Sequence, residues 1–126
     1  MPRLDPEQSA SGPRIHGFTA DGAFRVDGAS FAAGVMLTPT AAAAWSPPVL
    51  ARLDEADLAA ILHPLPEFLL LGTGAAQAQP PLALRQALDT RGVGIEAMDS
   101  RAAARLWGVL RAEGRAIAAA LYPLNG

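Results

Sequence analysis

The sequence predicts an α/β fold in a single domain, and three observations lead to this prediction. The chain has 126 residues, of which 51% are hydrophobic, so one core can form without a disulfide or a metal. The N-terminal third carries turn signals between short apolar runs, which is typical of β-strands. The second half alternates helical and strand patterns, which indicates partly parallel pairing through right-handed crossovers.

The N-terminal third is expected to be rich in strands. Residues 14–18 and 23–27 flank an Asp21-Gly22 turn and predict a β-hairpin. A second turn at Asp27-Gly28 precedes two further expected strands, at residues 30–32 and 35–37, the latter ended by Pro39. We expect residues 41–48 to form a connection in which Trp45 fills the edge of the core.

The second half is expected to contain three helices and three strands. Asp54 can cap the first helix, which ends at His63-Pro64, and residues 68–71 form a strand buried on both faces. A helix at 81–91, a strand at 95–98 and a third helix capped by Asp99 or Ser100 follow. Residues 116–120 have helical propensity, but the short apolar run closed by Pro123 favours a strand, which we prefer.

The composition excludes several functions. The chain has no cysteine, which removes thiol catalysis and thiolate metal sites. Its net charge is −2 and its pI is about 5.6, so we expect no nucleic-acid partner. No apolar run spans a membrane and the opening residues do not resemble a presequence, so we expect no membrane insertion and a cytoplasmic location.

All ten basic side chains are arginine, which suggests a GC-rich bacterial genome. We expect a flexible tail at residues 1–13 and the domain at 14–126.

Few motifs point to chemistry. Gly72-Thr73-Gly74 follows a predicted buried strand, where α/β proteins often bind anions, but a turn that merely needs glycine is the more common explanation of so short a motif. The two histidines, His16 and His63, lack metal-ligand spacing, so we expect no metal and no cofactor. There is no nucleophile elbow. The serines are therefore expected to be turn or cap residues: Ser30, Ser46 and Ser100.

The third predicted helix has two faces. Its apolar residues gather on one side, and Arg101, Arg105 and Arg111 lie on the other, near Glu96 and Asp99. The arginines could bind an anion or a partner, or be a solvated face. Gly108 in the helix interior suggests close packing or the approach of a ligand or another element.

Taken in order, several segments resemble one small uncharacterised family. They are residues 24–28, 34–39, Trp45, 68–74, 94–103, 113–115 and 118–121. The family includes bacterial and archaeal single-domain proteins, a mitochondrial assembly factor for respiratory complex I (NADH:ubiquinone oxidoreductase) and an adipogenesis-associated protein. The resemblance implies a three-layer fold with a mixed central sheet, flanking helices and a β-rich N-terminal layer, and makes residues 118–121 a strand.

The resemblance also guides the functional prediction. Many bacterial relatives carry Thr-Tyr-Asn where this chain has Leu106-Trp107-Gly108. The family has no established catalytic activity, so we expect a non-catalytic interaction or assembly module, linked to respiratory complexes, with a protein partner or a homo-oligomer. The alternative is a small-molecule or anion-binding protein, conceivably an enzyme. The candidate site residues are Gly72, Thr73, Gly74, Met98, Asp99, Arg101, Arg105, Glu113 and Arg115.

Overall fold

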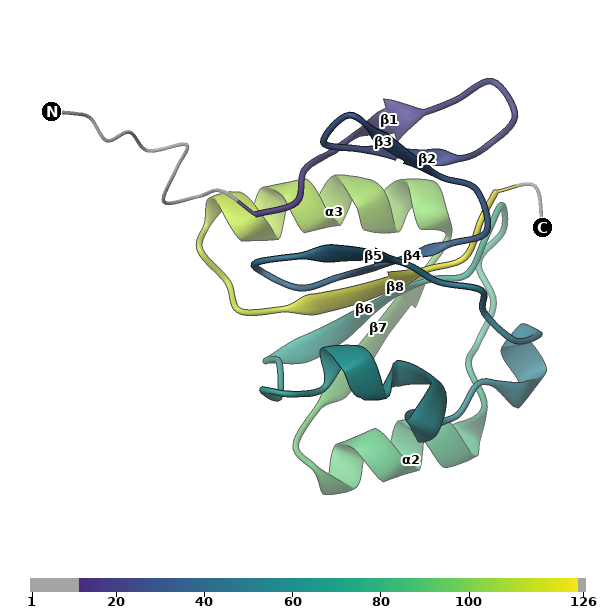
Figure 1. Cartoon of the computed structure of the whole chain (residues 1–126). Helices are drawn as coiled ribbons and strands as arrows, with labels where there is room; N and C mark the ends of the chain where they lie inside the picture. Colours follow the sequence, from purple (N-terminus) through teal and green to yellow (C-terminus); the bar gives the residue numbers. More distant parts are fainter. Residues whose placement is uncertain (1–11, 125–126) are drawn as a thin grey trace, which may run out of the picture.

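A five-stranded mixed β-sheet forms the middle layer of the computed structural model, which describes residues 12–124 (Figure 1). Of the expected tail, residues 1–11 lie outside this range, and Gly12 and Pro13 lie inside it. The elements follow in the order β1 (Ile15–Phe18), β2 (Phe24–Val26), β3 (Ala29–Phe31), β4 (Val35–Leu37), β5 (Ala42–Ala44), the 3-10 helices η1 (Leu50–Arg52) and η2 (Glu55–Ile61), β6 (Phe68–Gly72), α2 (Leu82–Thr90), β7 (Gly94–Met98), α3 (Ser100–Ala112) and β8 (Ala118–Leu121).

The N-terminal strands form a small antiparallel sheet in the order β1-β2-β3. The expected hairpin is confirmed, and its turn closes with a hydrogen bond from the Gly22 amide to the Thr19 carbonyl. Asp27 and Gly28 both have positive φ, as a two-residue turn between β2 and β3 requires. This sheet is the β-rich N-terminal layer that the resemblance implies.

The central sheet has the strand order β5-β4-β8-β6-β7. β6 pairs in parallel with both β7 and β8, whereas β4 is antiparallel to β8 and β5, so the sheet is mixed. The strand preferred for the last segment is therefore confirmed as β8. The expected connection at residues 41–48 is wrong at its start, because residues 42–44 pair with β4 as the edge strand β5.

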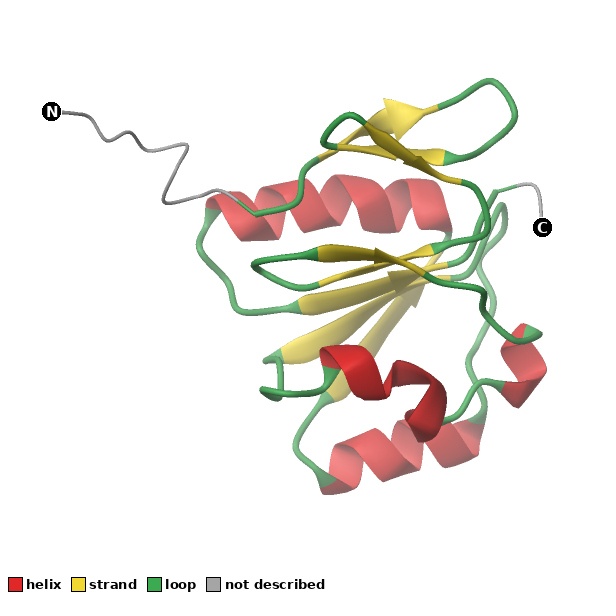
Figure 2. Cartoon of the chain, viewed as in Figure 1, coloured by secondary structure: helices red, strands yellow, loops and turns green. Residues whose placement is uncertain are grey.

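Each face of the central sheet has its own core. α2 and η2 cover one face, where Leu58, Leu71 and Leu88 are among the buried residues. α3 and the small sheet cover the other, where Phe24, Leu37 and Trp107 are buried (Figure 2). These layers confirm the predicted three-layer α/β fold.

The helix expected after Asp54 is present, with Asp54 as its cap. It is a 3-10 helix, and Asp54 accepts the amide of Asp57 while the Asp57 carboxylate accepts the amide of Asp54. Leu58 and Ile61 lie three residues apart and are both buried, which one turn of either helix type allows. The apolar spacing therefore could not distinguish the two helices.

Candidate functional site

The loop at residues 72–74 lies at the carboxyl end of β6, between the end of β7 and the start of α3. Gly72 has no room for a side chain, because a Cβ there would lie 2.7 Å from Leu121 Cδ2 and 2.8 Å from Ser100 Oγ. Gly74 has a φ of +101°, which favours glycine. Packing and backbone conformation thus account for both glycines.

The polar groups of this loop bond to the chain itself. The Thr73 amide donates to the Met98 carbonyl at 2.8 Å, and the Gly74 amide donates to Ser100 Oγ at 2.9 Å. The Thr73 hydroxyl donates to the Ala76 carbonyl at 2.7 Å and accepts the Ala78 amide at 3.1 Å. The amides of Thr73 and Gly74 are therefore already engaged by the protein.

Ser100, at the start of α3, connects the segment after β6 to the segment after β8. Its side chain is fully buried, accepts the Gly74 amide and donates to the Tyr122 carbonyl at 2.7 Å. The Ser100 amide in turn donates to the Gly74 carbonyl at 2.8 Å. A cap or turn role was the only role that the sequence suggested for Ser100, because nothing in the spacing shows that Tyr122 lies beside it.

Asp99 is the residue that caps α3. Its carboxylate accepts the Ala102 amide at 2.9 Å, so it occupies one of the free donors of the first helical turn. Of the two caps that the sequence allowed, the structure therefore selects Asp99 over Ser100. A negative charge already sits at this helix N-terminus.

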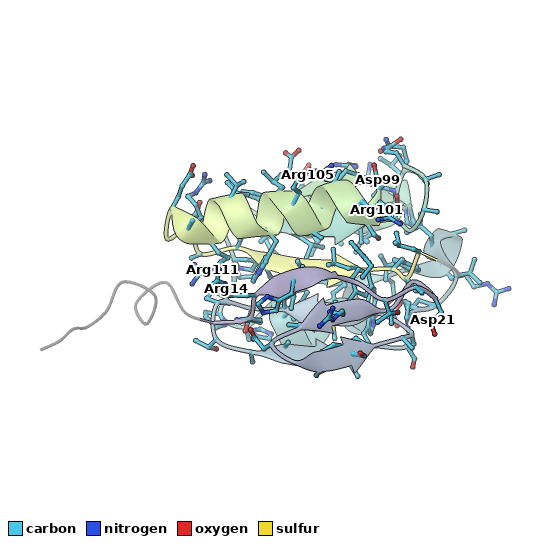
Figure 3. All side chains as sticks on the ribbon, turned by 90° about the horizontal axis from the view of Figure 1, so that it is seen from above. Arg14, Asp21, Asp99, Arg101, Arg105 and Arg111 are labelled. Atoms are coloured by element: carbon cyan, nitrogen blue, oxygen red, sulfur yellow. The ribbon has the colours of Figure 1, made fainter. Side chains whose placement is uncertain are left out.

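The candidate arginines follow α3 away from the loop (Figure 3). The Arg101 guanidinium lies 5.0 Å from the centre of the Phe18 ring, a cation–π contact with the small sheet. Arg105 follows one turn later, is exposed, and makes no hydrogen bond or ion pair with the described residues. Arg111 instead donates to the Arg115 carbonyl at 2.7 Å, at the carboxyl end of the helix.

Glu113 and Arg115 lie at the opposite end of α3 from the loop. A helix of 13 residues is about 20 Å long, so these two do not join the other candidates. Arg115 pairs with Glu67 at 2.8 Å. A hydrogen bond from the Ala116 amide, together with Arg115, lowers the pKa of Glu67. The nine candidates thus form one group at residues 72–74, 98, 99 and 101, with Arg105 beside it, and a separate pair.

A cavity of about 590 Å³ lies beside the loop. Thr73 and Gly74 form one part of its wall, and Pro48, Val49 and Tyr122 form another. The Tyr122 hydroxyl donates to the Pro48 carbonyl at 2.7 Å. Burial and, secondarily, the Asp57 carboxylate raise the pKa of Tyr122 to about 12, so the phenol stays protonated at neutral pH.

The two histidines lie on opposite sides of the central sheet. His16 lies on β1, 3.6 Å from Asp27, while His63 lines a mostly apolar cavity of about 440 Å³ on the opposite face of the sheet. Within residues 12–124 neither histidine bonds to Ser30, Ser46 or Ser100. The described residues hold no group of three potential metal ligands.

The triplet at 106–108 divides between core and surface. Trp107 is buried, and its indole Nε1 donates to the Pro13 carbonyl at 3.1 Å. Gly108 is exposed, and a Cβ there would meet no atom within 4 Å. The close packing suggested for Gly108 is therefore wrong for the described chain, and the approach of something outside it stays a prediction.

Comparisons with known proteins find one family model and several similar proteins. Residues 18–122 match a family model described as a protein of unknown function, DUF498/DUF598. An uncharacterised protein of Rhodobacter capsulatus is 37% identical over 105 residues, which cover 83% of this chain and 81% of that protein. A Bordetella parapertussis crystal structure has a TM-score of 0.80 and 32% identity, covering 90% of this chain and 97% of the other. A solution structure of a Bordetella pertussis protein, described as a Mth938-like domain, has a TM-score of 0.78 and 27% identity, covering 100% of this chain and 93% of the other.

Proposed function

The chain belongs to the family of proteins of unknown function DUF498/DUF598, and on that premise we propose that it is a non-catalytic protein-interaction module of the assembly type. Its proposed task is to hold a protein partner during assembly of a respiratory complex, in the cytoplasm of a bacterium. The respiratory part of this proposal rests on the resemblance to a complex I assembly factor. The interaction part rests on one exposed surface. No helix among the described residues is long and apolar enough to cross a membrane.

The observation that carries the proposal is a row of side chains on the solvent side of α3. Arg101, Arg105 and Val109 follow one another at intervals of four residues, so they share one face of the helix. Val109 is 53% exposed, so an apolar side chain lies at the surface next to the two cations. Arginine and apolar side chains together are typical of protein interfaces. We call these three residues the α3 face.

The α3 face fits a partner that carries carboxylates around an apolar residue. Arg105 is the more available of the two cations for binding a partner, because it makes no contact with a carboxylate among the described residues. Arg101 lies over the Phe18 ring and is exposed, so its guanidinium is also open to a partner. An acidic partner would gain charge-assisted hydrogen bonds from both guanidinium groups.

The test is capture of partners from the organism that encodes the protein. A tagged wild-type chain should retain a reproducible partner, and Arg105→Glu should lose it because the charge opposes an acidic surface. Arg52→Glu is the matched control, since Arg52 is also exposed and unpaired among the described residues but lies on η1. Equal capture by all three proteins, or no partner together with intact respiratory complexes in a deletion strain, would refute the proposal.

A second candidate function is small-molecule or anion binding, favoured by the 590 Å³ cavity beside the loop. Ligands of α/β proteins often bind at the carboxyl ends of parallel strands, and Gly74 lies there. Nucleotides, phosphates and carboxylates should raise the melting temperature if one of them binds. Ala75→Trp, which puts an indole into this cavity, should abolish the shift, and Arg101→Ala should weaken it for anions. A shift unchanged by both variants would remove this site.

A further inference from the structure

Among residues 12–124, no strand pairs with the outer side of the β5 backbone. β5 pairs antiparallel with β4, with Met36 opposite Ala43. The Trp45 amide donates to the Gly34 carbonyl, and the Thr38 amide donates to the Ala41 carbonyl. Because hydrogen-bonded and non-bonded pairs alternate in an antiparallel ladder, Ala43 also bonds toward β4. The N–H and C=O groups of Ala42 and Ala44 therefore point away from the sheet.

In the part of the chain that the structure describes, the other edge of the same sheet has side-chain protection that β5 lacks. At the β7 edge, Arg85 donates to the Ile95 carbonyl at 3.0 Å, and Glu96 places a charge on the strand. Proteins commonly protect edge strands by keeping them very short, or with charges, prolines or bulges. At three residues β5 is short, which limits what it can bind. It contains no charge, proline or bulge, and its pairing with β4 is regular. No charged residue occurs anywhere between Gly28 and Ala51.

We propose that β5 pairs antiparallel with β5 of a second copy of this chain, about a two-fold axis at Ala43. In this register Ala42 of each copy faces Ala44 of the other. The outward N–H and C=O groups of both residues then bond across the axis, and the two central sheets become continuous. The Ala43 side chains meet in a non-bonded pair, whose short spacing suits a methyl group.

Two features favour a second copy over a foreign strand. First, the outward groups are symmetric about Ala43, so the strand is complementary to itself in the antiparallel direction. Identical edges with charges would repel each other, but this segment is neutral over residues 28–51.

Second, a copy adds contacts beyond the strand itself. In this register Ser46 of one copy lies opposite Thr40 of the other, in the turn that helps to line the 440 Å³ cavity. This added contact matters because a three-residue strand alone buries much less than the roughly 1,200 Å² of a stable interface.

The dimer goes beyond the proposed function and does not depend on it. The edge at β5 and the α3 face are different surfaces, so either can exist without the other. Loss of the dimer would leave the Arg105 capture experiment interpretable, and loss of the partner would leave the mass of the chain unchanged.

The experiment measures the mass of the full chain by sedimentation equilibrium from micromolar to millimolar concentration. The wild type should approach twice 13.0 kDa. Ala43→Lys and Ala43→Glu should each raise the dissociation constant about tenfold or more, because two like charges would meet at the axis. Mixing the two variants should restore a heterodimer, which no folding defect could do. Ala83→Lys and Ala83→Glu, at an exposed site on α2, are the matched controls and should dimerise as the wild type does.

Amide hydrogen exchange locates the contact. Exchange at Ala42 and Ala44 should slow as the concentration rises, because their amides become bonded only in the dimer. The Ala43 amide should change less, since it already bonds to β4. A chain that stays at 13.0 kDa, or a dimer indifferent to charge at residue 43, would overturn the proposal. Protection of Ala42 and Ala44 only by a different protein would overturn it too, and would assign the edge to a foreign strand.

Discussion

The Pro13 carbonyl accepts a hydrogen bond from the indole of Trp107 across 94 residues of sequence. Pro13 and Trp107 are both buried, so this bond anchors the segment before β1 to the middle of α3. One residue earlier, Gly12 lies so close to the Pro39 carbonyl that a Cβ would overlap it. The chain ahead of the small sheet is thus held at two points, and Trp107 is an organising residue of the core.

Replacing the indole tests how much this anchor contributes. Trp107→Phe keeps an aromatic ring but removes the donor, which leaves the buried Pro13 carbonyl without that bond. We expect a loss of about 1–3 kcal/mol in the free energy of unfolding, measured in urea. Trp45→Phe is the control, because the Trp45 indole makes no hydrogen bond with the described residues. An equal or larger loss for Trp45→Phe would mean that ring size, not the bond, explains the result.

Ser100 is expected to stabilise the carboxyl ends of β6 and β8, beside the loop. Ser100→Ala removes one acceptor and one donor from a fully buried site, where water cannot replace them. The free energy of unfolding should fall by about 1–3 kcal/mol, and the Gly74 amide should exchange faster with solvent. Ser30→Ala, at an exposed position on β3, should change neither quantity. Unchanged exchange at Gly74 would contradict the role assigned to this hydroxyl.

Gly108 should be replaceable at a gain in stability. Glycine in a helix interior costs about 1 kcal/mol relative to alanine, and a Cβ at Gly108 meets open space. Gly108→Ala should therefore raise the free energy of unfolding by about that amount. Gly114 also has space for a Cβ but a φ of +77°, so Gly114→Ala should lower stability by about 1 kcal/mol. Destabilisation by Gly108→Ala would show that α3 is distorted at this point. If a partner approaches this glycine, the same variant should bind it less well despite its stability.

Tyr122 should make the fold sensitive to strong alkali. Its folded pKa is about 12, above the ordinary value of 10, because burial disfavours the phenolate. This difference in pKa adds to the free energy cost of ionising Tyr122 in the folded state. The fold therefore keeps its full stability below pH 10 and loses part of it as the pH rises from 10 through 12. Tyr122 is the only tyrosine in the chain, so phenolate absorbance reports it directly. Tyr122→Phe should lack this component of the pH dependence. A phenol that ionises near pH 10 while the fold is intact would contradict it.

Most of the fold could be predicted because local patterns and tertiary structure agree. Hydrophobic runs bounded by proline and glycine marked β4 and β6, and the apolar and charged faces of α3 are separated as the sequence indicates. β5 could not be predicted, since alanine disfavours strands and the segment is a strand only because β4 lies beside it. The Thr38 hydroxyl accepts the Thr40 and Ala41 amides in the connecting turn, which local propensity does not show.

The candidate site could be predicted only in part, for a different reason. Residues adjacent in sequence, such as Thr73 and Gly74, necessarily lie together. The parallel pairing of β6 with β7 then places Met98 and Asp99 beside them, as the predicted sheet implies. Ser100 and Tyr122 contact each other through a side chain and a carbonyl 22 residues apart, and no spacing rule predicts such a contact. Arg115 is a predicted neighbour of the loop, but it lies at the far end of α3 and pairs with Glu67.

The hydrogen bond from Arg85 to the Ile95 carbonyl limits how far the sheet can grow. A sheet with two open edges can add strands at both and polymerise without end. Here Arg85 occupies one carbonyl of the β7 edge, so strand addition to the central sheet is expected at β5. A symmetric contact at β5 would consume that site in both copies, leaving closed pairs in place of filaments. A dimer formed in this way would be closed, because its two free β5 edges are both used and each β7 edge carries the Arg85 contact.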